Sequence, residues 1–279
     1  MTLLGASAGY RALTQGVAAC RQNYDLVHAD GPDATKFLQS QLSQDIEKLP
    51  IGATKLSFLL HPQGRIVAVV QVTRKGESEI ELLTERGFGE PVRAALERFK
   101  IRTKCTLTTE PVERFAIRGP LAPEGGVWAT WPGIDVVAVP EGIDEVEASV
   151  FEMVRIERGI PRNGAEIEEK TLPAETGLVE GAVNFTKGCY VGQELVERID
   201  SRGHVNRRLR GLDFDQDPPE DGVSVGATIS ADGKSVGMLT SVAHRVVGPG
   251  LVALGYLRRE IESGAVVHVG TSAATVREL

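Results

Sequence analysis

Residues 184–203 read NFTKGCYVGQELVERIDSRG, and they place Lys187 and Cys189 in a glycine-punctuated stretch directly before a helical pattern. Glycine tolerates positive φ, so Gly188 and Gly192 favour a tight connection at this point of the chain. The run GQELVERI predicts a helix that begins near Gly192. The stretch therefore predicts a constrained turn that leads into a helix.

Cys189 has two interpretations on sequence grounds. A thiol reacts or binds metal as the thiolate, and both a neighbouring cation such as Lys187 and a helix N-terminus favour that form. A lone cysteine is also common as a small buried hydrophobe. The other two cysteines, Cys20 and Cys105, are distant, and the chain has no CxxC pair. The sequence therefore predicts neither a disulfide framework nor a zinc site.

The charge of the chain is acidic overall and basic in one place. Lysine and arginine number 31 against 38 acids, a net charge of −7, so nucleic acid is not expected as a partner. Five arginines and one aspartate between Arg198 and Arg210 give a local balance of +4. This patch suits an anionic ligand, or it pairs with the acids of the DFDQDPPED segment that follows.

The 279 residues have ordinary globular composition, and the longest apolar run, Ile66–Val70, is far too short for a membrane helix. With no secretory pattern at the start, we expect a soluble cytoplasmic protein. Residues 1–23 show little periodicity and predict a weakly ordered lead-in. Three apolar runs between residues 54 and 84, the first two rich in β-branched residues, predict a meander of strands. Helical and strand patterns alternate irregularly over residues 24–206, which indicates an α+β body. From residue 207 onward, short apolar runs about ten residues apart predict an antiparallel β-barrel.

Glu175 stands in the segment EKTLPAETGL as a second candidate for binding. The two oxygens of one carboxylate can accept hydrogen bonds from an N–H and a neighbouring amino group of a flat heterocycle. The alternative is a solvated acid in a loop. Residue type alone leaves both interpretations open.

Several segments resemble the YgfZ family, folate-binding proteins that assist the assembly or repair of iron-sulfur enzymes. KGCYVGQE at residues 187–194 is similar to the family motif K-G-C-Y-x-G-Q-E. The segments DGPDATKFLQSQLSQDI, HPQGRI, RIERGIPRNG and LPAETGL resemble family segments in the same order. The family in turn resembles the aminomethyltransferase (T-protein) of the glycine cleavage system and the folate-binding domain of a tRNA-modifying GTPase. The resemblance implies an aminomethyltransferase-like α+β folate-binding body at residues 24–206 and a C-terminal antiparallel β-barrel at residues 207–279.

The resemblance also implies a site for tetrahydrofolate or a one-carbon derivative. Glu175 takes the place of the carboxylate that holds the pterin ring. The remaining cofactor-binding candidates are Lys187, Gly188, Tyr190, Gly192, Gln193, Arg198 and Arg202. Cys189 and Lys187 are the candidate catalytic residues. Cys189 is expected to act as a nucleophile or a transient cluster ligand, with no resident metal, because a cluster normally takes four thiolates.

One position departs from the aminomethyltransferases. The strand that carries their catalytic aspartate aligns with QGRIVAVVQVT, which brings Ala68 to its place. Aminomethyl transfer is therefore not the expected activity. The leading hypothesis is a folate-binding accessory protein whose partners are iron-sulfur assembly or client proteins. The alternatives are a folate-dependent one-carbon transferase with another acid-base residue, and an RNA- or protein-binding module linked to tRNA modification.

Overall fold

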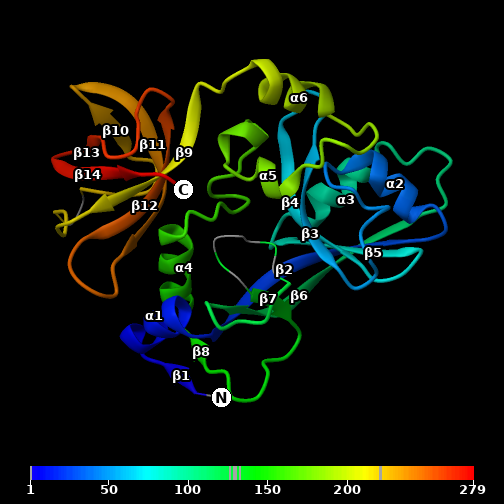
Figure 1. Ribbon diagram of the computed structural model, residues 1–279, viewed down its shortest axis with the longest axis horizontal. Helices are drawn as coiled ribbons and strands as arrows, with labels where there is room; N and C mark the ends of the chain where they lie inside the picture. Colours follow the sequence, from blue (N-terminus) through cyan, green and yellow to red (C-terminus); the bar gives the residue numbers. More distant parts are fainter. Residues whose placement is uncertain (1, 126, 128–130, 132, 220–221) are drawn as a thin grey trace.

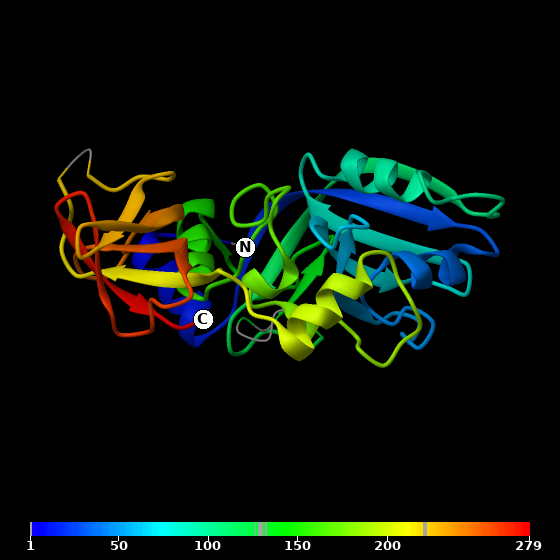
Figure 2. The same ribbon diagram turned by 90° about the horizontal axis from the view of Figure 1, so that it is seen from above.

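The computed structural model describes residues 2–125, 127, 131, 133–219 and 222–279, apart from the side chains of Asp200 and Arg202. An α+β body and a closed β-barrel lie next to each other, with two helices, α1 and α4, between the sheet and the barrel (Figures 1 and 2). In the described part of the chain, no helix is long and apolar enough to cross a membrane.

The body is built on one mixed sheet in which β2 is the central strand. β2 pairs antiparallel with both β5 and β6, and β3, β4 and β5 form an antiparallel meander. The apolar, β-branched runs of the sequence predicted this meander, and the structure confirms it. The strands of the sheet are β1 Leu3–Leu4, β2 Ala18–Asp30, β3 Thr54–Leu60, β4 Ile66–Arg74, β5 Glu79–Glu85, β6 Thr106–Arg118, β7 Gly133–Val136 and β8 Glu145–Val146.

Helices α2 (Ala34–Gln41) and α3 (Gly89–Glu97) cover one face of this sheet. Phe37 and Leu38 of α2 and Leu96 of α3 are buried against the alternate residues of β4 and β5 that face them. The opposite face of the same strands carries more polar side chains, and the candidate site lies there. The remaining helical elements are α1 Ala6–Gln15, α4 Ala148–Glu157, the 3₁₀ turn η1 Pro173–Glu175, α5 Val179–Ala182 and α6 Gln193–Arg202.

The C-terminal strands close into a barrel in the order β10-β11-β12-β9-β14-β13. Its interior is apolar, with Leu212, Phe214 and Leu257 among the buried residues. This confirms the expected antiparallel barrel, and closure leaves it no unpaired edge. The strands are β9 Arg207–Phe214, β10 Thr228–Ala231, β11 Lys234–His244, β12 Leu251–Arg258, β13 Val266–Val269 and β14 Ser272–Arg277.

The first residues of the chain are ordered, so the prediction of a weakly ordered lead-in was wrong. Residues 2–23 form β1, α1 and the start of β2. Leu13 of α1 is fully buried, in a cluster that also includes Val150 of α4 and Val252 of the barrel. Small residues gave α1 a weak helical pattern in sequence, and packing against α4 stabilises it.

A buried polar network joins the body to the barrel. Glu166 is 1% exposed, and its carboxylate accepts hydrogen bonds from Arg155 of α4 at 3.0 Å and from Thr240 and Ser241 of β11. The hydroxyl of Tyr256 on β12 donates to the main-chain oxygen of Glu166 at 2.9 Å. One buried acid thus holds α4 and two barrel strands together.

Candidate functional site

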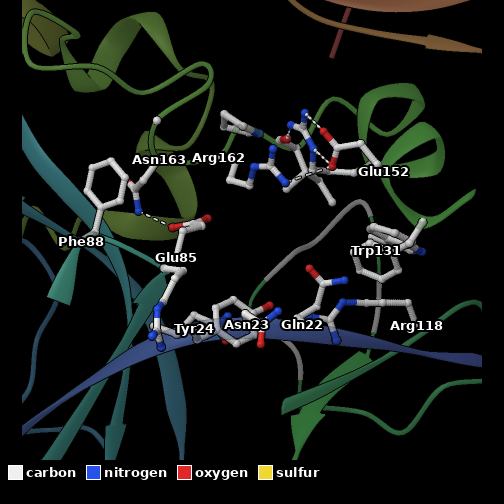
Figure 3. A pocket seen from close by; sticks show the side chains of 17 residues that line it. Gln22, Asn23, Tyr24, Glu85, Phe88, Arg118, Trp131, Glu152, Arg162 and Asn163 are labelled. Atoms are coloured by element: carbon white, nitrogen blue, oxygen red, sulfur yellow. Dashed lines mark hydrogen bonds and ion pairs between the residues drawn. The ribbon is translucent and has the colours of Figure 1, made fainter. Parts of the chain in front are cut away.

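A cavity of about 380 Å³ lies on the polar face of the sheet. β2, β4, β5 and β6 form one wall, and α4 with the segment at residues 160–164 forms the other. Figure 3 shows Glu85, Phe88 and Asn163 on one side of it, with Arg118 and Trp131 on the other. Its volume falls within the range of small-molecule sites.

Glu85 is the last residue of β5 and the acid of the cavity on that strand. The side-chain amide of Asn163 donates to its carboxylate (Figure 3). The same amide donates to the main-chain oxygen of Val69 at 2.8 Å, and its oxygen accepts from the Val69 N–H at 2.9 Å. Asn163 therefore pairs with β4 as a neighbouring strand would, which fixes its position beside Glu85. Burial raises the pKa of Glu85.

Aromatic rings form much of the apolar surface of the cavity. Tyr24 and Phe88 lie near Glu85, and the ring centroids of Trp131 and Phe151 are 4.5 Å apart on the far side. Burial raises the pKa of Tyr24 well above its ordinary value, so the phenol is neutral. The indole N–H of Trp131 is buried and has no acceptor among the described residues. A flat ring system with a polar edge fits this lining.

The charged side chains of the cavity are mainly cationic. Four arginines and two glutamates line it, a balance of +2. Arg118 is 3% exposed and pairs with Asp135 at 2.9 Å, so its charge is compensated. The side chain of Arg162 is 44% exposed and pairs with Glu152 at 3.2 Å. Arg162 can therefore receive an anionic group, as can Arg86, whose side chain is 56% exposed and lies 3.5 Å from Asp25.

Ala68 does not lie in the cavity. It is fully buried in the core under α2 and α3. Residues of a strand alternate between its faces, and Gln71 is the residue of β4 that reaches the cavity. Position 68 therefore does not determine which acids face this cavity, and the neighbouring strand contributes Glu85 to its lining.

Glu175, the predicted pterin carboxylate, lies in η1 beside the barrel and does not line the cavity. Arg207 of β9 binds both of its oxygens, at 3.0 and 3.1 Å, and the Leu172 N–H donates to Oε2. The Arg207 guanidinium in turn lies 4.4 Å from the ring centre of Tyr256. This carboxylate thus has internal partners on both oxygens.

The motif residues gather in the loop before α6, away from the cavity lining. Lys187 and Tyr190 are buried, whereas Cys189 and Gly188 are exposed. Gly192, at φ +83°, begins α6 as predicted. Three further candidates follow in α6: the Gln193 side chain accepts from the Tyr190 N–H at 3.2 Å, Arg198 is exposed, and the side chain of Arg202 lies outside the described residues.

The expected ligand cavity and the motif at residues 187–194 therefore lie in different places in the structure, although the sequence predicted a single site. Among the described residues, none of the predicted site residues lines the cavity, and its own polar groups were not among the candidates. A signal for them existed, since Arg162 and Asn163 stand in the family-like segment RIERGIPRNG. No sequence feature singled out Glu85, because it ends an ordinary strand pattern that resembles the neighbouring strands and belongs to no motif.

Comparison with known proteins gives the family context. Residues 10–125 match the GCVT N-terminal domain. The chain is 27% identical to the iron-sulfur cluster assembly factor IBA57 of Mus musculus, covering 88% of this chain and 78% of that one. It is 25% identical to the tRNA-modifying protein YgfZ of Serratia proteamaculans, covering 69% of each. The glycine cleavage system aminomethyltransferase T of Bartonella henselae matches in fold, with a TM-score of 0.79, 20% identity, and coverage of 99% of this chain and 89% of that one.

Proposed function

Because the chain resembles the YgfZ and IBA57 proteins along most of its length, we propose that it is a folate-binding accessory protein for the assembly or repair of iron-sulfur enzymes. In this proposal the cavity binds tetrahydrofolate or a one-carbon derivative, and Cys189 is needed at the contact with an iron-sulfur protein.

The observation that carries the folate assignment is the composition of the cavity. A pterin presents an N–H beside an amino group, and the Glu85 carboxylate can accept from both. Tyr24 and Phe88 offer ring faces and edges to the flat heterocycle. Arg162 offers a guanidinium to the glutamate tail of a folate. The acid thus suits the N–H and amino group of the pterin, the aromatic rings suit its flat heterocycle, and the arginine suits the glutamate tail.

Cys189 supports the second half of the proposal through its exposure. It is the exposed thiol of the chain, whereas Cys20 and Cys105 are buried. The described residues contain no group of three or more His, Cys, Asp and Glu side chains that could hold a metal. An iron-sulfur cluster normally takes four thiolates, so Cys189 acts either as one ligand of a cluster shared with a partner or as a nucleophile toward it.

Glu175 remains a candidate for the pterin contact through the family resemblance, together with Lys187, Gly188, Tyr190, Gly192, Gln193, Arg198 and Arg202 for the cofactor. To bind a pterin, Glu175 must exchange its two contacts with Arg207 for contacts with the ligand. Among the described residues, no cationic side chain pairs with Glu85, whose carboxylate accepts from the neutral amide of Asn163. Substitution at the two positions distinguishes them.

The folate half is tested by titrating folinic acid, a stable tetrahydrofolate derivative, into the protein in a calorimeter. Glu85→Gln should weaken binding by about 1.5–3 kcal/mol, roughly 10- to 150-fold, because an amide donor replaces one acceptor. Glu79→Gln, at an exposed position of the same strand, is the matched control and should bind as the wild type does. A loss confined to Glu175→Gln would assign the pterin to η1, and no binding by the wild type would overturn the folate assignment.

The iron-sulfur half is tested in cells that lack the native gene. Cys189→Ala should lower the activity of iron-sulfur client enzymes while the melting temperature of the purified variant stays the same, because the thiol is exposed. Cys105→Ala, at a buried thiol, is the control that should change stability before it changes client activity. Full client activity with Cys189→Ala would contradict the role of the thiol.

Glu85 also supports a second candidate, a folate-dependent one-carbon transferase. Burial raises the pKa of the Glu85 carboxyl, so this acid keeps its proton to a higher pH than an exposed glutamate and can serve as a general acid. Incubation with tetrahydrofolate and candidate one-carbon donors tests it. Methylenetetrahydrofolate formed by the wild type and lost in Glu85→Gln would favour the transferase over the accessory protein.

A further inference from the structure

The side chain of Lys187 ends in a cage of main-chain oxygens. Its Nζ lies 2.6 Å from the oxygen of Gln39, 2.7 Å from that of Leu42 and 2.8 Å from that of Gln44. An ammonium has three N–H groups, and three carbonyls receive them. The residue is only 9% exposed. The amine is therefore fully occupied by the fold.

The cage lies at the C-terminal end of α2, where main-chain oxygens lack helical partners and the helix dipole is negative. A cation is favoured at such a position. Burial lowers the pKa of Lys187 to about 8, and the nearby Asp45 and Glu47 act in the opposite direction. The amine is thus protonated at pH 7, as three acceptor oxygens require.

Further contacts hold the same loop against the same segment. The Asn184 N–H donates to the Ser43 oxygen at 3.0 Å, and the Val191 N–H donates to the Ser40 oxygen at 3.2 Å. Tyr190 is 7% exposed, and the centre of its ring lies 5.3 Å from the Lys187 ammonium. The loop is therefore anchored on both sides of Gly188 and Cys189.

Between these anchors the chain faces solvent. Gly188 and Cys189 are exposed, and a Cβ at Gly188 would meet no atom within 4 Å. A span of two residues with buried neighbours at both ends has little freedom. The position of the Cys189 thiol thus depends on the attachment of Lys187.

We propose that Lys187 is a positioning residue: its ammonium closes a three-carbonyl cage at the end of α2 and thereby holds the exposed Cys189 thiol in one orientation. This role differs from the catalytic one expected of Lys187 from its motif. It depends on neither folate nor an iron-sulfur partner, so it can be tested independently of the proposed function.

A nitroxide label on Cys189 reports the orientation directly, because Cys20 and Cys105 are 1% and 6% exposed and stay unlabelled in the folded protein. The wild type should give the broad electron paramagnetic resonance spectrum of an immobilised label. Lys187→Met keeps much of the buried volume and removes the charge and the N–H groups, and it should sharpen the spectrum. Lys170→Ala, at an exposed lysine, is the control that should leave it broad.

Chemical rescue separates the cage from a general loss of packing. Lys187→Ala should bind propylammonium in the vacated cage, which should restore the broad spectrum and raise the melting temperature. Tetramethylammonium has no N–H and should do neither. Equal immobilisation of the label in folded Lys187→Met, or equal rescue by both cations, would overturn the proposal. If Lys187→Ala does not fold without the amine, the Lys187→Met spectrum still decides.

Discussion

Asn163 donates a hydrogen bond to Glu85 while it occupies both main-chain groups of β4 at one position. Glu85 is thus held by a residue that is itself fixed to the neighbouring strand. The hydroxyl of Thr84 also accepts from Asn163, at 3.1 Å. This geometry couples the position of the acid to the integrity of the sheet.

Asn163→Ala should both destabilise the protein and remove the side chain that holds Glu85 in position. It leaves the N–H of Val69 without its side-chain acceptor in a buried place, so we expect a loss of about 1–3 kcal/mol in the free energy of unfolding. Urea denaturation measures it. Asn23→Ala, at an exposed position on the other wall of the cavity, should change stability by less than about 0.5 kcal/mol. Equal effects of the two substitutions would contradict the bridging role.

Glu85 should make stability fall as the pH rises. Burial raises its pKa in the folded state above the ordinary 4.5, so between these two values the folded protein binds more protons than the unfolded chain. The stabilisation from the protonated acid is present below pH 4.5 and lost as the pH rises through the folded pKa. The groups that face Glu85 are Tyr24 from β2, Arg162 and Asn163 from the segment after α4, and Arg86 beside it.

The measurement compares Glu85→Gln with the wild type by urea unfolding between pH 4 and pH 7. The variant lacks the titration, so its stability relative to the wild type should be higher at pH 7 than at pH 4. A constant difference across this range would show that the acid has the same pKa in both states.

Glu166→Ala should weaken the attachment of the barrel strongly. It removes one carboxylate partner of Arg155, which is 4% exposed, and leaves Ser241 without its acceptor. Breaking a buried charge pair in this way costs about 3–5 kcal/mol. Denaturant unfolding followed by intrinsic fluorescence measures the loss. Glu169→Ala, at an exposed acid in the same segment, is the control and should leave the midpoint unchanged.

The two motif glycines should respond differently to alanine. Gly192 has φ +83°, and a Cβ there would lie 2.7 Å from the His61 oxygen, so Gly192→Ala should cost at least about 1–2 kcal/mol. Gly188 has open space around it and no positive φ, so Gly188→Ala should change the melting temperature little. A similar loss at both positions would contradict the backbone explanation for Gly192.

Local sequence patterns predicted those parts of the fold in which the spacing of apolar residues reflects which side chains are buried. Apolar, β-branched runs predicted β3, β4 and β5, and evenly spaced short runs predicted the barrel. α1 was missed because its stability comes from α4 and the barrel, which are distant in sequence. In the site, Glu85 and Asn163 meet across 78 residues of chain, and no periodicity reports such a contact. The motif identified Lys187, but its partners lie 143–148 residues earlier, so its role could not be derived from spacing.

Arg155 belongs to two neighbourhoods at once, since its side chain borders the cavity and also donates to Ser241 in the barrel at 2.8 Å. A substitution of Arg155 therefore changes both the cavity wall and the contact with the barrel, so fewer substitutions are tolerated there than at a residue with one of these roles. We therefore expect that related proteins whose cavity binds another ligand differ at Arg162 or Tyr24 and keep Arg155. A comparison of orthologous sequences would show whether positions 162 and 24 vary more than position 155.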